Sequence, residues 1–179
     1  MSIRAKKSLG QNFLKAKWAL KLMTETAQIE KGNMVLEAGP GKGILTEKLL
    51  QAGAMVIAVE KDRRLIPELN KKFAEEIKSG NLKIIEGDIL KFNPADHGLK
   101  TMNYKLVANI PYYITGGFLE KFLSGEIQPE KIVLIIQREV AKRITARDGK
   151  ESVLSISVKA YGEPKYLKTV GKELFSPKP

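Results

Sequence analysis

The sequence predicts an α/β protein whose mostly parallel, open sheet carries helices on both faces, the arrangement called Rossmann-like. Two observations predict this class. Short apolar runs rich in Val and Ile alternate along the chain with longer segments of helical periodicity, which is typical of a parallel sheet covered by helices. The first run ends in an acid and is followed directly by glycines at positions 39, 41 and 43, which indicates a strand, a tight turn and a helix.

Each expected strand is an apolar run that ends at a polar residue or a turn. The strands are expected at residues 34–37, 55–59, 82–85, 104–108, 131–136 and about 165–170. The first helix is expected after residue 14. The other helices are expected at about 44–50, 63–77, 116–123, 138–146 and 153–161. Glycine-containing turns at 31–33, 51–53 and 79–81 end the first three of them. The chain has 179 residues, and without a linker or an internal repeat we expect one domain.

The composition favours a nucleic-acid partner. Lys and Arg number 31 against 20 Asp and Glu, a net charge of +11, and such a surplus favours a polyanionic partner. No apolar run approaches the ~20 residues of a membrane-spanning helix, and no signal-peptide core follows the basic N-terminus. We therefore expect a cytoplasmic protein without membrane contact. Because there is no cysteine and one histidine, His97, which we expect in an exposed loop, we expect no metal.

The glycine turn differs from the dinucleotide-binding fingerprint. Its third glycine, Gly43, follows the second after two residues rather than three, and Ile44 stands at the fingerprint position. The amides of such a turn and of the helix end could receive a carboxylate, while Glu37 could accept hydrogen bonds from an amine. An amine with a carboxylate indicates an amino-acid head group. The alternative is an ordinary turn that binds nothing.

Two further acids stand at strand ends. Glu60 ends the second expected strand, where a carboxylate can accept hydrogen bonds from both hydroxyls of a ribose. Asp88 follows the third, where it could accept from the exocyclic amine of adenine. Together with the turn, these acids indicate an adenosine that carries an amino acid, which is S-adenosylmethionine. Taken one at a time, each acid could equally be a solvated loop charge.

The segment Asn109-Ile110-Pro111-Tyr112 supplies what methyl transfer to an aromatic amine requires. Such an amine is a poor nucleophile because its lone pair is delocalised into the ring. Accepting its N–H hydrogens on the Asn109 oxygen and on a carbonyl of the turn would free that lone pair. Pro111 restrains the turn, and Tyr112 offers a face on which a flipped base can stack. The alternative is a structural Asn-Pro turn with a core tyrosine.

These motifs together resemble one family. They are Gln11-Asn12-Phe13-Leu14, Glu37-Ala38-Gly39-Pro40-Gly41-Lys42-Gly43, Glu60, Gly87-Asp88 and Asn109-Ile110-Pro111-Tyr112. Their combination resembles the ribosomal RNA adenine N6-dimethyltransferases, which are class I methyltransferases. Residues 7–14 and 112–115 are most similar to the small-subunit branch. That branch dimethylates two adjacent adenines in a hairpin loop near the 3′ end of small-subunit rRNA, a step of ribosome biogenesis.

The resemblance implies roles for individual residues. It implies a cofactor, S-adenosylmethionine, bound by Gln11, Asn12, Leu14, Glu37, Gly39, Gly41, Gly43, Glu60, Asp88 and Asn109. It implies a catalytic set of Asn109, Pro111 and Tyr112, and a target base held by Tyr112, Tyr113 and Phe175. The implied partner is small-subunit rRNA in a pre-30S particle, and we expect a monomer.

The resemblance covers residues 1–179, which we interpret as a catalytic domain. The family continues beyond the segment that ends here at Pro179 into a last strand and a small helical domain that grips RNA. Three alternatives stay open. The first is a large-subunit rRNA methyltransferase of the macrolide-resistance type. The second is a non-catalytic RNA-binding assembly or transcription factor on the same fold. The third, a nicotinamide oxidoreductase, is disfavoured by Ile44.

Overall fold

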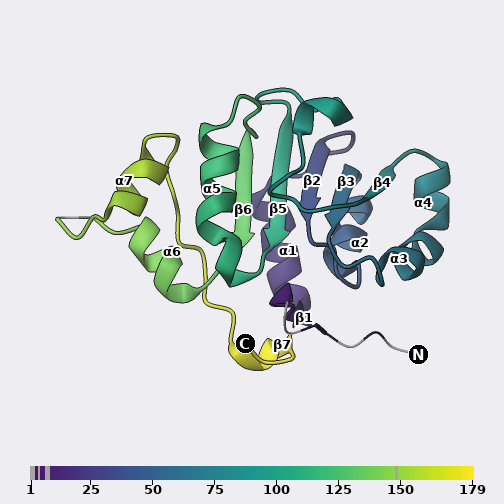
Figure 1. Ribbon diagram of the computed structural model, residues 1–179, viewed down its shortest axis with the longest axis horizontal. Helices are drawn as coiled ribbons and strands as arrows, with labels where there is room; N and C mark the ends of the chain where they lie inside the picture. Colours follow the sequence, from purple (N-terminus) through teal and green to yellow (C-terminus); the bar gives the residue numbers. More distant parts are fainter. Residues whose placement is uncertain (1–2, 4, 7–8, 148) are drawn as a thin grey trace.

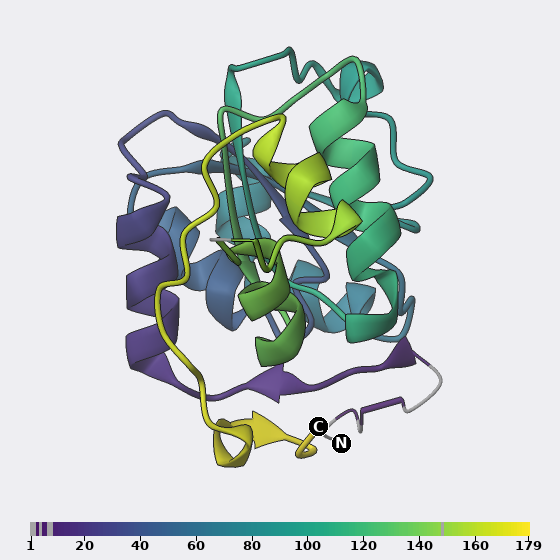
Figure 2. The same ribbon diagram turned by 90° about the vertical axis from the view of Figure 1, so that its left-hand side faces the viewer.

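A computed structural model describes residues 3, 5–6, 9–147 and 149–179 of the chain. Its centre is a parallel sheet in the order β4-β3-β2-β5-β6, with helices on both faces (Figures 1 and 2), so the predicted fold class is confirmed. The strands of this sheet are β2 (Met34–Ala38), β3 (Met55–Glu60), β4 (Leu82–Glu86), β5 (Tyr104–Asn109) and β6 (Lys131–Ile135).

The strand order reverses between β2 and β5. The chain runs outward from β2 to β3 and β4, then returns to the other side of β2 as β5 and continues to β6. In open parallel sheets, ligands bind beyond the carboxyl ends of the strands at such a reversal. The arrowheads of β5 and β6 point toward the edge where both chain termini lie (Figure 1). The site is therefore expected at that edge.

Each face of the sheet has its own apolar core, because side chains alternate along every strand. One core joins alternate residues of β2, β3 and β5 with α1 (Lys17–Thr26), α2 (Ile44–Gln51) and α3 (Ile66–Lys72). The core on the opposite face contains Phe118 and Phe122 of α5 (Thr115–Ser124). The short helix α4 (Ala74–Lys78) follows α3 and adds Ile77 to the first core.

Three sequence-based expectations are wrong in detail. The helix expected at 63–77 is interrupted at Phe73, which leaves helical backbone with φ −114° and ψ 31° and packs into the core. The segment 165–170 is not a strand, since no neighbouring strand pairs with it, and an alternating pattern needs a ladder partner to become one. His97 is half-buried in a 3-10 helix, η2 (Pro94–His97), with its ring stacked on Phe92 at 4.8 Å.

The two ends of the chain are joined by a small antiparallel pair that the sequence did not predict. Strand β1 (Phe13–Leu14) pairs with β7 (Phe175–Ser176), with Leu14 opposite Phe175. The Lys15 N–H adds a bond of 2.8 Å to the Leu174 carbonyl. Figure 2 shows the two segments side by side near the termini. This pair holds residues 13–14 beneath the carboxyl edge of the main sheet.

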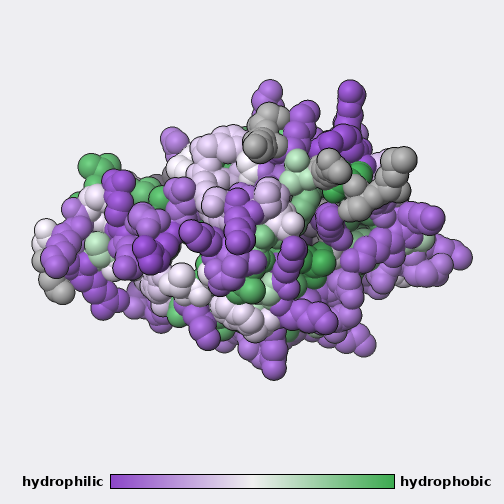
Figure 3. Space-filling model, turned by 90° about the horizontal axis from the view of Figure 1, so that it is seen from below, coloured by the Kyte–Doolittle hydropathy of each residue, from purple (hydrophilic) through white to green (hydrophobic). Residues whose placement is uncertain are grey.

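The carboxyl edge is polar on its outside. Seen from the side of the two termini, hydrophilic residues cover most of the surface and hydrophobic ones appear in small groups (Figure 3). In the part of the chain that the structure describes, no helix combines the length and apolarity of a membrane span.

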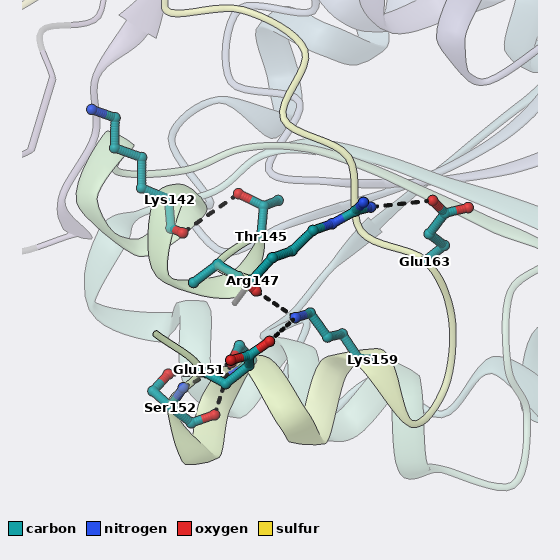
Figure 4. A network of polar contacts seen from close by, with 9 residues as sticks. Lys142, Thr145, Arg147, Glu151, Ser152, Lys159 and Glu163 are labelled. Carbon is teal, nitrogen blue, oxygen red and sulfur yellow. Dashed lines mark hydrogen bonds and ion pairs between the residues drawn. The ribbon is translucent and has the colours of Figure 1, made fainter. Parts of the chain in front are cut away.

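Helices α6 (Arg138–Ile144) and α7 (Val153–Lys159) form a separate lobe beside α5, with a small apolar contact of Leu119, Ile144 and Val158. Polar contacts close the loop between the two helices (Figure 4). Lys159 donates to the Ala146 carbonyl and pairs with Glu151 at 3.2 Å. Ser152 caps α7 reciprocally with Ser155. These bonds tie the loop to α7 in a lobe whose apolar core is small.

The packing of the glycine turn gives the first prediction. Gly43 has φ +72°, and a Cβ placed there would lie 2.5 Å from the ring of Phe73. We expect Gly43→Ala to lower the free energy of unfolding by about 2–5 kcal/mol, the sum of left-handed strain and overpacking. Urea unfolding measures it.

The matched control is Gly80→Ala. Gly80 has φ +80°, and a Cβ placed there would meet nothing within 4 Å. This variant therefore carries the strain without the clash and should cost about 1–2 kcal/mol. Equal losses in the two variants would contradict the packing argument.

Candidate functional site

The glycine turn connects β2 to α2 and curls tightly. Gly39, Gly41 and Gly43 have φ values of +68°, +58° and +72°, a region that glycine enters without steric cost. Space is open where a Cβ on Gly39 would lie, whereas Gly41 lies against the ring of Phe13. Of the three Cβ positions in the turn, the one at Gly39 is therefore open to a ligand, whereas those at Gly41 and Gly43 face aromatic rings.

The amides of this turn are used within the protein, which differs from the expectation that they receive a ligand carboxylate. The Gly39 N–H donates to the Val59 carbonyl at 2.9 Å, and the Gly43 N–H donates to the Pro40 carbonyl at 2.8 Å. The Gly41 N–H donates to a carboxylate. No intrahelical carbonyl accepts the first N–H groups of α2. The Thr46 N–H acts on Glu37, so the N–H groups of Ile44 and Leu45 are the donors left for a carboxylate. A direct contact from Gly41 or Gly43 to a cofactor stays a prediction.

Glu60 is buried at the end of β3, with 4% of its surface exposed. Its Oε2 accepts from the Gly41 N–H at 2.9 Å and its Oε1 accepts from the Asp62 N–H at 2.7 Å. Burial raises the pKa of its carboxyl, and these N–H donors partly offset the shift. A carboxylate has about four acceptor positions. Glu60 therefore braces the turn and has acceptor positions left. Its contact with a ribose stays a prediction.

Glu37 is the least satisfied polar group of the site. It is 1% exposed at the end of β2, and neither carboxyl oxygen has a hydrogen-bond partner in the described part of the chain. Burial raises its pKa to about 8, the nearby Thr46 lowers it somewhat, and the charge of Glu60 raises it further. Buried polar groups are normally paired, and the hydroxyl and N–H of Thr46, the donors that act on Glu37, are both neutral. The site therefore lacks a charged partner for this carboxyl.

Asp88 stands just beyond β4, where the sequence placed it, but with a partner that the sequence did not predict. Lys61 pairs with Asp88 at 2.7 Å, and the Leu90 N–H donates to the other oxygen at 3.0 Å. The bond to Lys61 is the main cause that lowers the pKa of Asp88. The carboxylate is therefore charged at neutral pH and able to accept from an adenine amine.

Gln11 has a structural role that differs from the expected cofactor contact. Its Nε2 donates to Asp62 at 2.9 Å, and its Oε1 accepts from the Lys6 N–H at 2.7 Å. Asp62 is held in turn by Arg64 at 2.6 Å, which lowers the pKa of Asp62 to about 2. Each end of the Gln11 amide thus has one partner, and the residue fastens the N-terminal segment to the loop after β3. A contact of Gln11 with a cofactor stays a prediction.

Asn109 ends β5 at the strand reversal. Its Nδ2 donates to the Asn12 carbonyl at 3.1 Å. Since this bond uses the amide nitrogen, the orientation of the side chain is set, and Oδ1 has no hydrogen-bond partner among the residues that the structure describes. Asn12 therefore acts here through its backbone, and Leu14 is buried in the first core. Their own contacts with a cofactor stay predictions.

The turn after Asn109 presents two tyrosines. Pro111, with φ −58°, precedes the short 3-10 helix η3 (Tyr112–Ile114), and the Thr115 hydroxyl donates to the Tyr112 carbonyl at 3.0 Å. Tyr112 is half-buried, and burial raises the pKa of its hydroxyl. Tyr113 is 63% exposed. The turn that follows Asn109 thus presents two tyrosine rings, that of Tyr112 partly exposed and that of Tyr113 largely exposed.

Phe175 is placed differently from what a stacking role requires. Its ring is 5% exposed and belongs to the first core, opposite Leu14. Together with Tyr112 it borders a cavity of about 1270 Å³ that extends between α1, β6 and the C-terminal segment. The glycine turn and the acids Glu37, Glu60 and Asp88 do not border it. This cavity is therefore separate from the candidate cofactor site.

The residues that sequence reasoning missed are those that hold the predicted ones in place. Two of them follow Glu60 in the chain. Lys61 binds Asp88, and Asp62 binds Gln11. Thr46, buried in α2, lies beside Glu37. The two charged residues directly after Glu60 could have indicated supporting ion pairs, but the sequence does not tell which residue each of them contacts.

Comparisons with known proteins agree on one family. A family model described as ribosomal RNA adenine dimethylase matches residues 2–179. A ribosomal RNA small subunit methyltransferase A of Dehalococcoides mccartyi is 42% identical over 178 residues, which make up 99% of this chain and 60% of that protein. This chain thus spans about 60% of the length of the curated relatives it matches first.

Solved structures are similar over most of the chain. A crystal structure of the 23S rRNA methyltransferase ErmE matches with a TM-score of 0.82 at 29% identity, covering 94% of this chain and 65% of that one. A dimethyladenosine transferase from Plasmodium falciparum matches with a TM-score of 0.75 at 32% identity, covering 93% of this chain and 59% of that one.

Burial of Glu37 predicts a pH dependence of stability. Its pKa in the folded state is about 8, above the ordinary value of 4.5. Between these values the unfolded chain has lost a proton that the folded chain retains, so this group lowers stability as pH rises, by at most ~1.4 kcal/mol per pH unit. We expect Glu37→Gln to remove this slope in urea unfolding measured from pH 5 to pH 8.

Glu75→Gln, which removes an exposed carboxyl from α4, is the control and should keep the parent slope. Curves for Glu37→Gln and the parent that stay parallel across this range would show that Glu37 is ionised in the folded protein.

Proposed function

Because this chain belongs to the ribosomal RNA adenine dimethylase family, we propose that it transfers methyl groups from S-adenosylmethionine to adenine N6 in ribosomal RNA. The observation that carries the proposal is Asn109. It stands at the strand reversal, its amide nitrogen is held by the Asn12 carbonyl, and its oxygen is left without a partner in the described part of the chain. An acceptor fixed in this way is what a target amine needs.

The site residues fit S-adenosylmethionine in three respects. Gly39 leaves open space at the turn, Glu37 lacks a donor among the described residues, and Glu60 and Asp88 present carboxylates at the next two strand ends. Gly39 and Glu37 would hold the amino-acid part, Glu60 the ribose and Asp88 the adenine. Once bound, the cofactor supplies a methyl group on a sulfonium centre.

The catalytic work of the chain is to orient and polarise the target amine. Asn109 Oδ1 would accept one N–H of the adenine amine, and the backbone carbonyl at Ile110 the other. Drawing on both hydrogens returns the lone pair to the nitrogen. The ring of Tyr112, restrained by Pro111 and Thr115, would stack on the flipped base. Asn109 and Tyr112 are held by the protein itself, and groups positioned before the reaction would stabilise the transition state without reorganisation.

The RNA partner is proposed from charge and from the relatives. The net charge of +11 attracts phosphates. Lys142 and Arg143 add exposed basic charge to α6, the helix whose first turn borders the same cavity as Tyr112. The name of the Dehalococcoides relative and the motifs at 7–14 and 112–115 favour small-subunit rRNA. We propose two adjacent adenines near its 3′ end, in a pre-30S particle, as the target. We further propose that the protein acts as a monomer in the cytoplasm.

The similarity to ErmE favours a second candidate, methylation of large-subunit rRNA. Incubation with labelled S-adenosylmethionine and each ribosomal subunit separately, followed by mapping of the labelled adenine, distinguishes the two. Label in the small subunit alone supports the first proposal. Label in the large subunit alone overturns it in favour of the second.

Asn109 gives a prediction about rate. Asn109→Ala should lower single-turnover methyl transfer ~10²–10³-fold, the usual loss when one preorganised polar partner is removed. Cofactor affinity should change far less, because the interaction strengthens in the transition state. Asn81→Ala, an exposed asparagine before β4, is the control. Transfer by Asn109→Ala at the parent rate would reduce Asn109 to a structural turn residue.

Tyr112 gives a prediction about binding. Tyr112→Ala should weaken rRNA binding by ~1–3 kcal/mol, the contribution of stacking one base, and slow turnover as well. Tyr112→Phe keeps the ring and should stay near the parent in both. Filter binding with the parent, both variants and Tyr161→Ala, an exposed tyrosine after α7, checks this. Equal losses in the Ala and Phe variants would point to the hydroxyl instead of the ring.

A further inference from the structure

We propose that Glu37 is protonated in the ligand-free protein and releases one proton to solvent when the α-ammonium group of the cofactor binds beside it. The inference rests on the proposed function, because it takes an adenosine that carries an amino acid as the ligand. It adds a proton to the binding equilibrium and makes Glu37 the positioning residue for the ammonium.

The location of Glu37 follows from strand alternation. Val35 and Glu37 of β2 point to the face covered by α2, and so do Ala58 and Glu60 of β3. Glu37 is 1% exposed, and both of its oxygens lack a partner in the described residues. The buried Thr46 of α2 faces Glu37, and its hydroxyl and N–H act as neutral donors that favour the ionised form. What this buried place beneath the glycine turn lacks is a positively charged partner.

The surroundings do not support a carboxylate at this place. Glu60 on β3 is a second buried acid whose charge opposes ionisation of Glu37. Lys72 on α3 is the cation that acts on Glu37, but it is half-exposed and already pairs with Glu47 at 2.9 Å. An unpaired buried carboxylate is costly. Glu37 therefore holds its proton, in accord with its pKa of about 8.

Glu60 differs from Glu37 although both are buried. Its two oxygens already accept from the backbone N–H groups of Gly41 and Asp62, and such donors favour the ionised form. Of the two acids, Glu37 is therefore the one that carries the proton. Glu60 is already stabilised by its two N–H donors, and a positively charged ligand would give Glu37 a comparable stabilisation.

An ammonium group is the donor that fits. It brings a full positive charge and several N–H bonds, so it stabilises a buried carboxylate more strongly than the neutral hydroxyl and N–H of Thr46 do. The Glu37 O–H bond breaks, its proton passes to solvent, and the carboxylate pairs with the ammonium, which keeps its own protons. The open space at Gly39, two residues along the chain, is where the ligand would approach.

The experiment is titration calorimetry with S-adenosylhomocysteine at pH 6.0 in two buffers of different ionisation enthalpy. At this pH an α-amino group, with a pKa of about 8, is protonated. The parent should release about one proton per ligand, and its affinity should rise about tenfold per unit from pH 5 to pH 7. Methylthioadenosine, which lacks the amino-acid part, should release almost none.

Two variants locate the proton. Glu37→Gln should bind S-adenosylhomocysteine without proton release and with nearly pH-independent affinity, while the exposed control Glu75→Gln should behave as the parent. If Glu37→Gln does not fold, the comparison of the two ligands on the parent still decides.

The outcomes distinguish failure of this inference from failure of the proposed function. S-adenosylhomocysteine binding without proton release, release that persists in Glu37→Gln, or equal release with methylthioadenosine overturns this inference and leaves the proposed function intact. A parent that binds neither ligand overturns the proposed cofactor itself.

Discussion

The site depends on the buried carboxylate of Glu60. One of its oxygens holds the Gly41 N–H and thereby the curl of the glycine turn, and the other holds the Asp62 N–H. Asp62 in turn binds Gln11, which lies next to the residue whose carbonyl orients Asn109. One strand-end acid thus links the cofactor side of the site to the catalytic side through hydrogen bonds and the peptide bond between Gln11 and Asn12.

Acidic and basic side chains occupy different parts of the molecule. The chain as a whole is strongly basic, yet acids line the carboxyl edge of β2, β3 and β4, two of them buried. Buried acids in low dielectric act strongly on a cationic ligand at short range, whereas exposed lysines and arginines act on phosphates through solvent. The same chain can therefore favour a cationic small molecule at the edge and a polyanion around it.

The glycines of the turn serve packing as much as ligand approach. Gly43 begins α2 in a left-handed conformation and admits the ring of Phe73, which interrupts α3 and α4. Gly41 admits the ring of Phe13 from β1. Aromatic rings from both sides thus fix the position of the turn. This explains why three glycines stand in it although the Cβ position is open at Gly39 and blocked by rings at the other two.

The sequence alone determined the main strands, the strand–turn–helix at the glycines and the acids at the strand ends, because apolar periodicity and glycine placement are local properties. Tertiary structure alone decided the rest. The β1–β7 pair is too short for any pattern, and segment 165–170 has a strand pattern without a partner. Whether Gln11 meets Asp62 or a ligand, and whether Phe175 is buried, depends on residues 51 and more than 160 positions apart. The missing partner of Glu37 could be recognised only in the folded chain, because hydrogen bonding and burial are properties of neighbours in space.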